Sequence, residues 1–166
     1  MYEQEKLDLD AKVQDYVEEF PKKKHPITIR QIGGHLAGIR HYKGQEYTSN
    51  KHYETVLDGL EVFENDPLIA KPLTKFNYSS YGWNLLSAVV EGASEEPFLD
   101  YMQESVFNPL EMEMTCADKK DSRLVHRTGF YSKKNNKIKL APEVDNSIKW
   151  AGGGFLSTAT DVLRFG

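Results

Sequence analysis

The chain has 166 residues, of which 39% are hydrophobic and 28% charged, and its formal net charge is −4. This balance is typical of a folded globular domain with a sizeable core and excludes a disordered or low-complexity protein. The overall negative charge disfavours nucleic acid and anionic membranes as partners, and no apolar run reaches the roughly 18 residues of a membrane-spanning helix. The single cysteine, Cys116, excludes an internal disulfide framework, and no metal-ligand spacing occurs. We therefore expect neither a metal nor another cofactor.

Capping signals divide the first half of the chain into short helices. Asp10 is a suitable N-cap for a helix over residues 11–17, and Thr28 opens a capping box that predicts a helix starting at Ile29. Asn50 suits the N-cap of a third helix. The apolar face of that helix recurs at steps of three and four residues, at Tyr53, Val56, Leu57, Leu60 and Phe63.

The second half predicts three more helices and a hairpin. The longest helix follows Tyr78, and Pro97 suits the first turn of the next. Residues 125–132 and 137–141 flank a polar turn and predict a β-hairpin, whose four lysines indicate a solvated edge. Thr158 then begins a last helix. The apolar stripe of the longest helix is Gly82, Leu85, Leu86, Val89, Val90 and Ala93.

The stretch from Phe76 to Gly82 is the most informative part of the chain. It places Tyr78 and two serines immediately before the longest predicted helix. Such a tyrosine has two interpretations. It packs against its neighbours, or it transfers protons because its surroundings lower its pKa from about 10 towards neutrality.

Several further stretches, taken together with Tyr78, match one superfamily. In their order and spacing they resemble the serine β-lactamase and penicillin-binding-protein superfamily, in its class C, esterase-like branch. Residues 35–42 and 149–158 are similar in particular to the mitochondrial type found in animals. The matching stretches cover nearly the whole chain: residues 6–10, 26–31, 35–42, 78–80, 108–112 and 144–161.

Enzymes of this superfamily work through three motifs. The serine of S-x-x-K is the nucleophile, Y-x-N or S-x-N supplies a proton carrier, and K-T-G shapes the oxyanion side of the site. The resemblance implies that Tyr78 is the proton carrier, with Ser80 where the family commonly has asparagine. It also implies that Ser80, Tyr42, Gly152 and Gly153 line the substrate pocket.

The other two motifs do not occur in these 166 residues. We therefore expect residues 1–166 to form a partial, truncated β-lactamase-related domain of the α+β class. It would hold most of the helical subdomain and a β-hairpin, without the nucleophile helix and the outer sheet strands that the resemblance implies. Such a piece is expected to expose apolar surface.

Simpler interpretations hold for the remaining candidate residues. His35, His41 and His52 lack a zinc-ligand spacing and are expected in loop or capping roles, and Ser79 is expected to cap a helix. The glycines over 152–154 lack the context of a phosphate-binding loop, so they indicate close backbone approach.

Two functions follow from the sequence. The resemblance implies a serine hydrolase of peptidase or esterase type, which acts by acyl transfer on a peptide or small ester, in mitochondria. Whether this chain is itself an enzyme stays open, because two of the three motifs are missing. The alternative is a non-catalytic structural or interaction protein, a pseudoenzyme or a fragment, capable of self-association.

Overall fold

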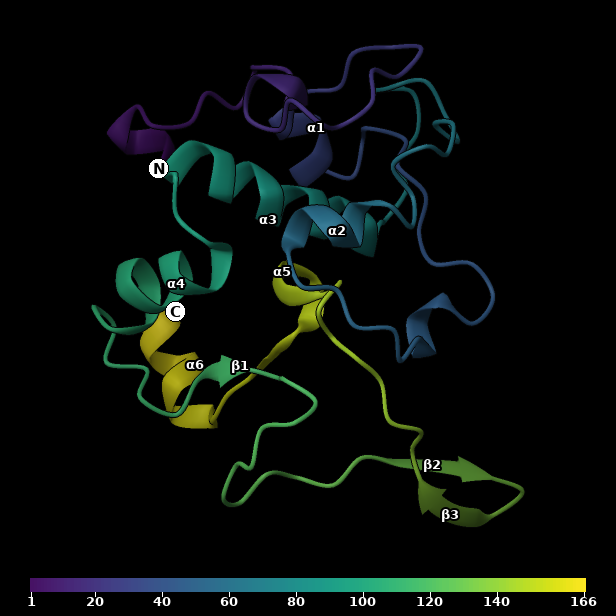
Figure 1. The fold of residues 1–166 in the computed structure, drawn as a ribbon, viewed down its shortest axis with the longest axis vertical. Coiled ribbons are helices and arrows are strands. Elements are labelled where there is room, and N and C mark those ends of the chain that lie inside the picture. Colours follow the sequence, from purple (N-terminus) through teal and green to yellow (C-terminus); the bar gives the residue numbers. More distant parts are fainter.

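The computed structural model describes all residues from 1 to 166 as a largely helical body with two small antiparallel sheets (Figure 1). This confirms the α+β prediction. The helices are α1 (Ile29–Gly33), α2 (Val56–Leu60), α3 (Ser80–Ser94), α4 (Phe98–Met102), α5 (Trp150–Gly153) and α6 (Ala159–Phe165). Strand β1 (Cys116–Ala117) pairs with β4 (Phe155–Leu156), and β2 (Tyr131–Lys134) pairs with β3 (Lys137–Leu140). Short 3-10 turns cover Tyr2–Gln4, Val13–Asp15 and Glu46–Thr48, and a π-helical turn covers Gln103–Phe107.

Helix α3 is the centre of the molecule. It packs against α1, α2, α4 and α5, with α1 above it and α5 below it in the view of Figure 1. Tyr81 and Leu85 are completely buried and Val89 nearly so, within one core cluster of 19 buried hydrophobic residues. Because this core draws on residues from Val13 to Trp150, the chain folds around a single hydrophobic centre.

Two helices begin where the capping signals predict, α1 at Ile29 and α6 at Ala159. Thr28 accepts a hydrogen bond from the Gln31 amide, and Thr158 accepts one from the Asp161 amide. Each threonine satisfies an amide that would otherwise lack a partner in the first helical turn.

The helix predicted over 11–17 is wrong. Only the turn Val13–Asp15 forms there, because Lys12 pairs with Thr28 in an antiparallel bridge that keeps the chain extended. The carboxylate of Asp10 binds Arg30 at 2.8 Å and caps no helix.

The predicted cap at Asn50 is also wrong. Helix α2 begins after Thr55, whose hydroxyl accepts a hydrogen bond from the Asp58 amide at 3.0 Å. The preceding residues are extended, and the amide of Tyr53 binds the hydroxyl of Ser147. A residue far away in the sequence therefore binds the backbone that the periodic pattern predicted to be helical.

The hairpin exists with shifted boundaries. Its first strand begins at Tyr131, where the prediction began at residue 125, and the turn is shortened to Asn135 and Asn136. Both asparagines have positive φ, of 51° and 57°, which is the geometry of a tight two-residue hairpin turn.

An apolar groove of about 610 Å³ agrees with the expectation of exposed apolar surface. It lies between the N-terminal segment, α3, α4 and the C-terminal helix, and 12 of its 14 lining residues are hydrophobic. Leu9, Trp83, Leu86 and Phe165 are among them. No helix is both long enough and apolar enough to cross a bilayer.

Gly92 marks the closest approach between α3 and the N-terminal segment. A Cβ atom there would lie 1.9 Å from the carbonyl oxygen of Tyr16, so only glycine fits. We expect Gly92→Ala to lower the free energy of unfolding by about 1–3 kcal/mol, although alanine favours a helix intrinsically. Urea denaturation followed by circular dichroism measures the change.

Gly33→Ala is the matched control for Gly92→Ala. A Cβ at residue 33 meets only the Leu86 side chain, at 3.9 Å, so its stability is expected to stay level or rise. An unchanged denaturation midpoint for Gly92→Ala would show that the two segments are not packed in this way.

Candidate active site

Tyr78 lies directly before α3, where the sequence places the proton carrier. Its ring packs against His35 with centroids 4.5 Å apart and against His41 at 5.6 Å. The residue is 49% exposed, so solvent has access to it. Tyr78 is therefore held from two sides and open on another.

The two histidines also cap α3. Nδ1 of His35 accepts a hydrogen bond from the amide of Ser79 at 3.3 Å, and Nδ1 of His41 accepts one from the amide of Ser80 at 3.1 Å. An accepting Nδ1 carries no proton, so the neutral rings are protonated at Nε2. Burial lowers the pKa of His35, which favours its neutral form. Both histidines were expected in loop or capping roles, and both cap α3.

Two buried serines complete the start of α3. The hydroxyl of Ser79 accepts a hydrogen bond from the Gly82 amide at 3.0 Å and donates one to the carbonyl oxygen of Arg40 at 2.6 Å. Ser79 therefore caps the helix as predicted and ties it to the 35–42 segment. Ser80 is buried beside it, next to Tyr42.

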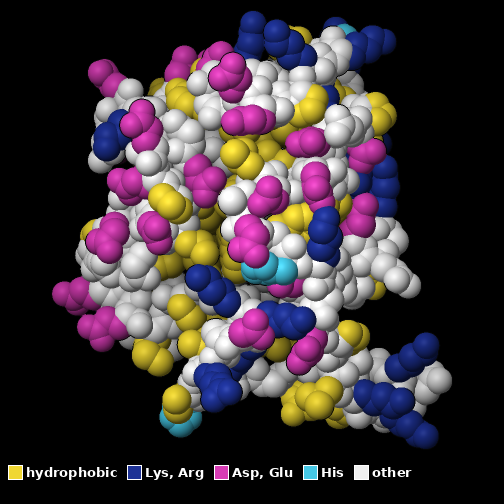
Figure 2. Space-filling model, viewed as in Figure 1, with side chains coloured by type: hydrophobic (Ala, Val, Ile, Leu, Met, Phe, Trp, Pro, Cys, Tyr) yellow, Lys and Arg dark blue, Asp and Glu magenta, His cyan; other side chains and the backbone are white.

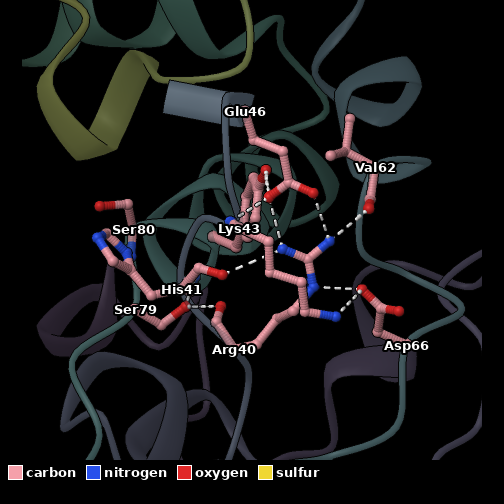
Figure 3. Close-up of polar contacts among 10 residues, drawn as sticks. Arg40, His41, Lys43, Glu46, Val62, Asp66, Ser79 and Ser80 are labelled. Carbon is pink, nitrogen blue, oxygen red and sulfur yellow. Dashed lines mark hydrogen bonds and ion pairs between the residues drawn. The ribbon is translucent and has the colours of Figure 1, made fainter. Parts of the chain in front are cut away.

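Arg40 is the electrostatic centre of this region (Figure 3). Its side chain is only 6% exposed, and its guanidinium pairs with both Glu46 and Asp66. Two nitrogens reach the two Glu46 oxygens at 2.7 and 3.0 Å, a bidentate arrangement. The guanidinium also donates to the carbonyl oxygens of His41 and Val62. The guanidinium thus connects the loop that carries His41 and Glu46 with Val62 and Asp66.

Tyr81 connects this cation to the core. Its hydroxyl donates to Glu46 at 2.9 Å, its ring stacks on Phe63 at 4.5 Å, and the Arg40 guanidinium lies 4.9 Å from its centroid. Burial, followed by the bond to Glu46, raises the pKa of Tyr81. Tyr81 is therefore a neutral structural phenol within the core, whereas Tyr78 is half-exposed.

The residues predicted to line the pocket meet at the same end of α3, with one exception. Tyr42 packs edge-on against Tyr81 at 4.9 Å, and burial raises its pKa, while contact with the Ser80 hydroxyl acts in the opposite direction. A Cβ at Gly152 would lie 3.4 Å from the Ser80 carbonyl oxygen, so α5 rests on α3 there. Gly153 has no atom near its Cβ position and joins no such contact. The pocket-lining role of these residues stays a prediction.

The sequence analysis did not identify Arg40 or Glu46 as positioning residues. For Arg40, the signal that could have done so is its place in the run 35–42, together with His35, His41 and Tyr42. None of the chain's cation–π contacts involves Tyr78, and no group of three His, Cys, Asp or Glu side chains is arranged to hold a metal ion.

Comparison with known proteins assigns the whole chain to one family. The sequence model of the β-lactamase family matches residues 1–166. The chain belongs to the β-lactamase family. It is 33% identical to the human serine beta-lactamase-like protein LACTB, mitochondrial, over all of this chain and 43% of that protein. The chain thus spans less than half the length of the curated relatives it matches.

Solved structures share the fold. The D-stereospecific amidohydrolase from Streptomyces superposes with a TM-score of 0.82 at 21% identity, over 99% of this chain and 54% of that one. FmtA from Staphylococcus aureus gives 0.86 at 18% identity, over 99% and 45%. The described residues therefore form part of the β-lactamase fold, as the resemblance implied.

Arg40→Gln tests the buried ion pairs. Removing the guanidinium leaves two carboxylates without their shared partner, so we expect the free energy of unfolding to fall by about 2–4 kcal/mol. This is below the loss for fully buried pairs because Glu46 and Asp66 keep 26% and 33% of their side chains exposed. Chemical denaturation measures it.

Arg30→Gln is the control for this loss. Arg30 forms a similar bidentate pair with Asp10, but both side chains are more than half exposed. Exposed pairs contribute little, so no measurable change is expected. Equal losses for the two variants would contradict a special role for Arg40.

Acid should weaken this region through the same carboxylates. Burial alone would raise the pKa of Glu46, but hydrogen bonds from Arg40, the Lys43 amide and Tyr81 outweigh it and lower the pKa below its usual 4.5. The bond from Arg40 likewise lowers the pKa of Asp66 below 3.8. Lowered carboxyl pKa values stabilise the folded state above the ordinary values, and the stabilisation is lost as pH falls through the lowered ones.

We therefore expect the free energy of unfolding to fall more steeply from about pH 5 to pH 3 in the unmodified protein than in Arg40→Gln. Denaturation series at stepped pH measure both slopes. Parallel slopes would show that Arg40 does not hold these carboxyl groups in their charged form.

Proposed function

We propose that this chain carries the tyrosine side of a serine hydrolase site that acts by acyl transfer. The observation that carries the proposal is the placement of Tyr78, which lies half-exposed at the start of α3 between two histidines that fix the helix end. A general acid or base needs a fixed position and access to the substrate, and Tyr78 has both.

In the proposed reaction, Tyr78 takes the proton from the hydroxyl of a nucleophilic serine. A serine hydroxyl attacks a carbonyl only when a neighbour takes its proton, and a phenolate is strong enough to take it. The proposed proton transfer also needs a cation beside the phenol, a part that the family's S-x-x-K lysine would take.

The 166-residue chain is proposed to be inactive by itself. It contains neither S-x-x-K nor K-T-G, and Arg40, the buried cation near the site, is already paired with two carboxylates. The nucleophile and its lysine are proposed to come from residues outside this sequence. The alternative, a non-catalytic structural or interaction protein, is supported by the same missing motifs.

An amide or ester carbonyl of a peptide or small molecule is the proposed substrate. The name of the Streptomyces amidohydrolase describes amide hydrolysis by that protein, which shares the fold. A mitochondrial location is proposed from the names of the mammalian relatives, which are 32–33% identical to this chain.

A fluorophosphonate probe, which labels activated serines covalently, tests the proposal. The longest reading frame that contains this sequence is expected to label, and the 166-residue chain is not. Tyr78→Phe in the longer protein is expected to slow labelling by about 10²–10⁴-fold, because it removes the proton carrier.

Tyr47→Phe is the matched control for this experiment. It also deletes a phenol hydroxyl, from a residue 58% exposed and outside the Tyr78 cluster, and should label at the unmodified rate. A folded longer protein that does not label would favour the non-catalytic alternative, and labelling unaffected by Tyr78→Phe would remove Tyr78 from the mechanism.

A further inference from the structure

Three aromatic rings surround the imidazole of His35. Phe76 packs edge-on against it with ring centroids 5.8 Å apart, and Trp83 does the same at 5.6 Å. Tyr78 lies against the same imidazole at 4.5 Å. We call these four side chains the aromatic wall. One histidine therefore joins the candidate catalytic tyrosine to a phenylalanine that lies two residues earlier in the chain.

Phe76 is the most exposed member of the aromatic wall. Its exposed fraction is 65%, although phenylalanine is among the residues that folded proteins bury most often. Tyr78 beside it is 49% exposed, whereas His35 and Trp83 are partly buried. The structure therefore presents two neighbouring aromatic rings to solvent, and both rest on the same imidazole.

Backbone hydrogen bonds hold Phe76 in this exposed position. The amide of Asn77 donates to the carbonyl oxygen of His35 at 2.9 Å, and the amide of Leu73 donates to the carbonyl oxygen of Leu36 at 2.9 Å. The chain is thus fixed on both sides of the phenyl ring, which nonetheless stays uncovered. Such a ring is suited to contact a ligand, because little conformational freedom is lost on binding.

The aromatic wall lacks negative charge. Acidic side chains are spread over the body of the molecule (Figure 2), but the segments 35–42 and 71–78 contain none. Lys71 and Lys75 are exposed in the second segment. Nδ1 of His35 accepts an amide hydrogen bond and burial lowers the pKa of this histidine, so its ring is neutral. Charge therefore does not attract a cationic ligand to the wall, and the exposed surface there is aromatic.

We propose that Phe76 is a specificity-determining residue that contacts an aromatic side chain next to the attacked carbonyl of the substrate. This rests on the function proposed above, in which Tyr78 takes the proton of the attacking serine. Because Phe76 and Tyr78 contact the same imidazole, the side chain beside a carbonyl at that serine lies within reach of the phenyl ring. Two aromatic rings in contact attract each other beyond the burial of their area. The substrate class is thus amides and esters of aromatic amino acids.

Hydrolysis by the longest reading frame that contains this sequence tests the proposal. The N-acetylated 4-methylcoumarin-7-amides of phenylalanine, alanine and lysine share the attacked bond and differ in the side chain. The phenylalanine substrate is expected to have a kcat/KM about 10–100-fold above the other two. Phe76→Ala should reduce this preference to about threefold or less, and Phe76→Tyr, which keeps an aromatic ring, should retain it.

The ratio between the substrates separates a substrate contact from a structural role. A variant that only displaced Tyr78 would slow all three substrates equally, as Tyr78→Phe is expected to do. Phe130→Ala is the matched control, because it removes another phenyl ring, 49% exposed and outside the aromatic wall. It should leave the ratio unchanged, and circular dichroism checks the fold of each variant.

The 166-residue chain provides a second test that needs no reaction. N-acetylphenylalaninamide at millimolar concentration is expected to shift the ¹H–¹³C signals of the Phe76 and Tyr78 rings in a saturable way. N-acetylalaninamide should not shift them, and Phe76→Ala should abolish the shift at Tyr78.

Two kinetic results would overturn the proposal. They are equal kcat/KM values for the phenylalanine and alanine substrates, and a preference for phenylalanine that survives Phe76→Ala. Failure of the proposed function has a different signature, a folded longer protein that neither labels with the fluorophosphonate nor hydrolyses any of the three substrates. The binding measurement then decides on the contact by itself: saturable shifts at Phe76 support it, and their absence overturns it.

Discussion

The start of α3 depends on a buried guanidinium, that of Arg40. Arg40 is removed from water, and an unpaired buried cation would be too costly to keep. Glu46, Asp66 and the Val62 carbonyl therefore close around it. The Tyr81 hydroxyl, which binds Glu46, and the Ser79 hydroxyl, which binds the Arg40 carbonyl oxygen, join the segment between His35 and Tyr42 to α3. That segment in turn supplies both histidines that cap the helix. The position of Tyr78 therefore depends on a charge that has no part in the proposed proton transfer.

The sequence predicted those parts of the fold that depend on neighbouring residues. Thr28, Ser79 and Thr158 cap helices because a short side chain and an amide three residues later form a local pair. Asn50 and Asp10 carry the same local signal and failed, because Ser147 and Arg30 bind the nearby chain or the side chain from a distance. A local capping signal does not start a helix where a residue distant in the sequence binds the same segment.

The candidate site could be predicted only in part, for the same reason. Tyr78 was found through its resemblance to a family motif, and its place before α3 followed from the helix periodicity. The cluster around Arg40 joins residues 6, 22 and 26 positions apart, which no periodic pattern or motif brings together. The aromatic wall shows the same limit, since only the structure reveals that Phe76 and Trp83 pack against the histidine that Tyr78 contacts.

The protonation sites of His35 and His41 test most directly whether this region supports Tyr78 as described. A long-range ¹H–¹⁵N correlation spectrum of the histidine rings distinguishes the two neutral tautomers near pH 7.5. Because both Nδ1 atoms accept amide hydrogen bonds from the start of α3, both rings are expected as the Nε2–H form. A proton on Nδ1 of either ring would contradict the capped helix end and the position of Tyr78 that depends on it.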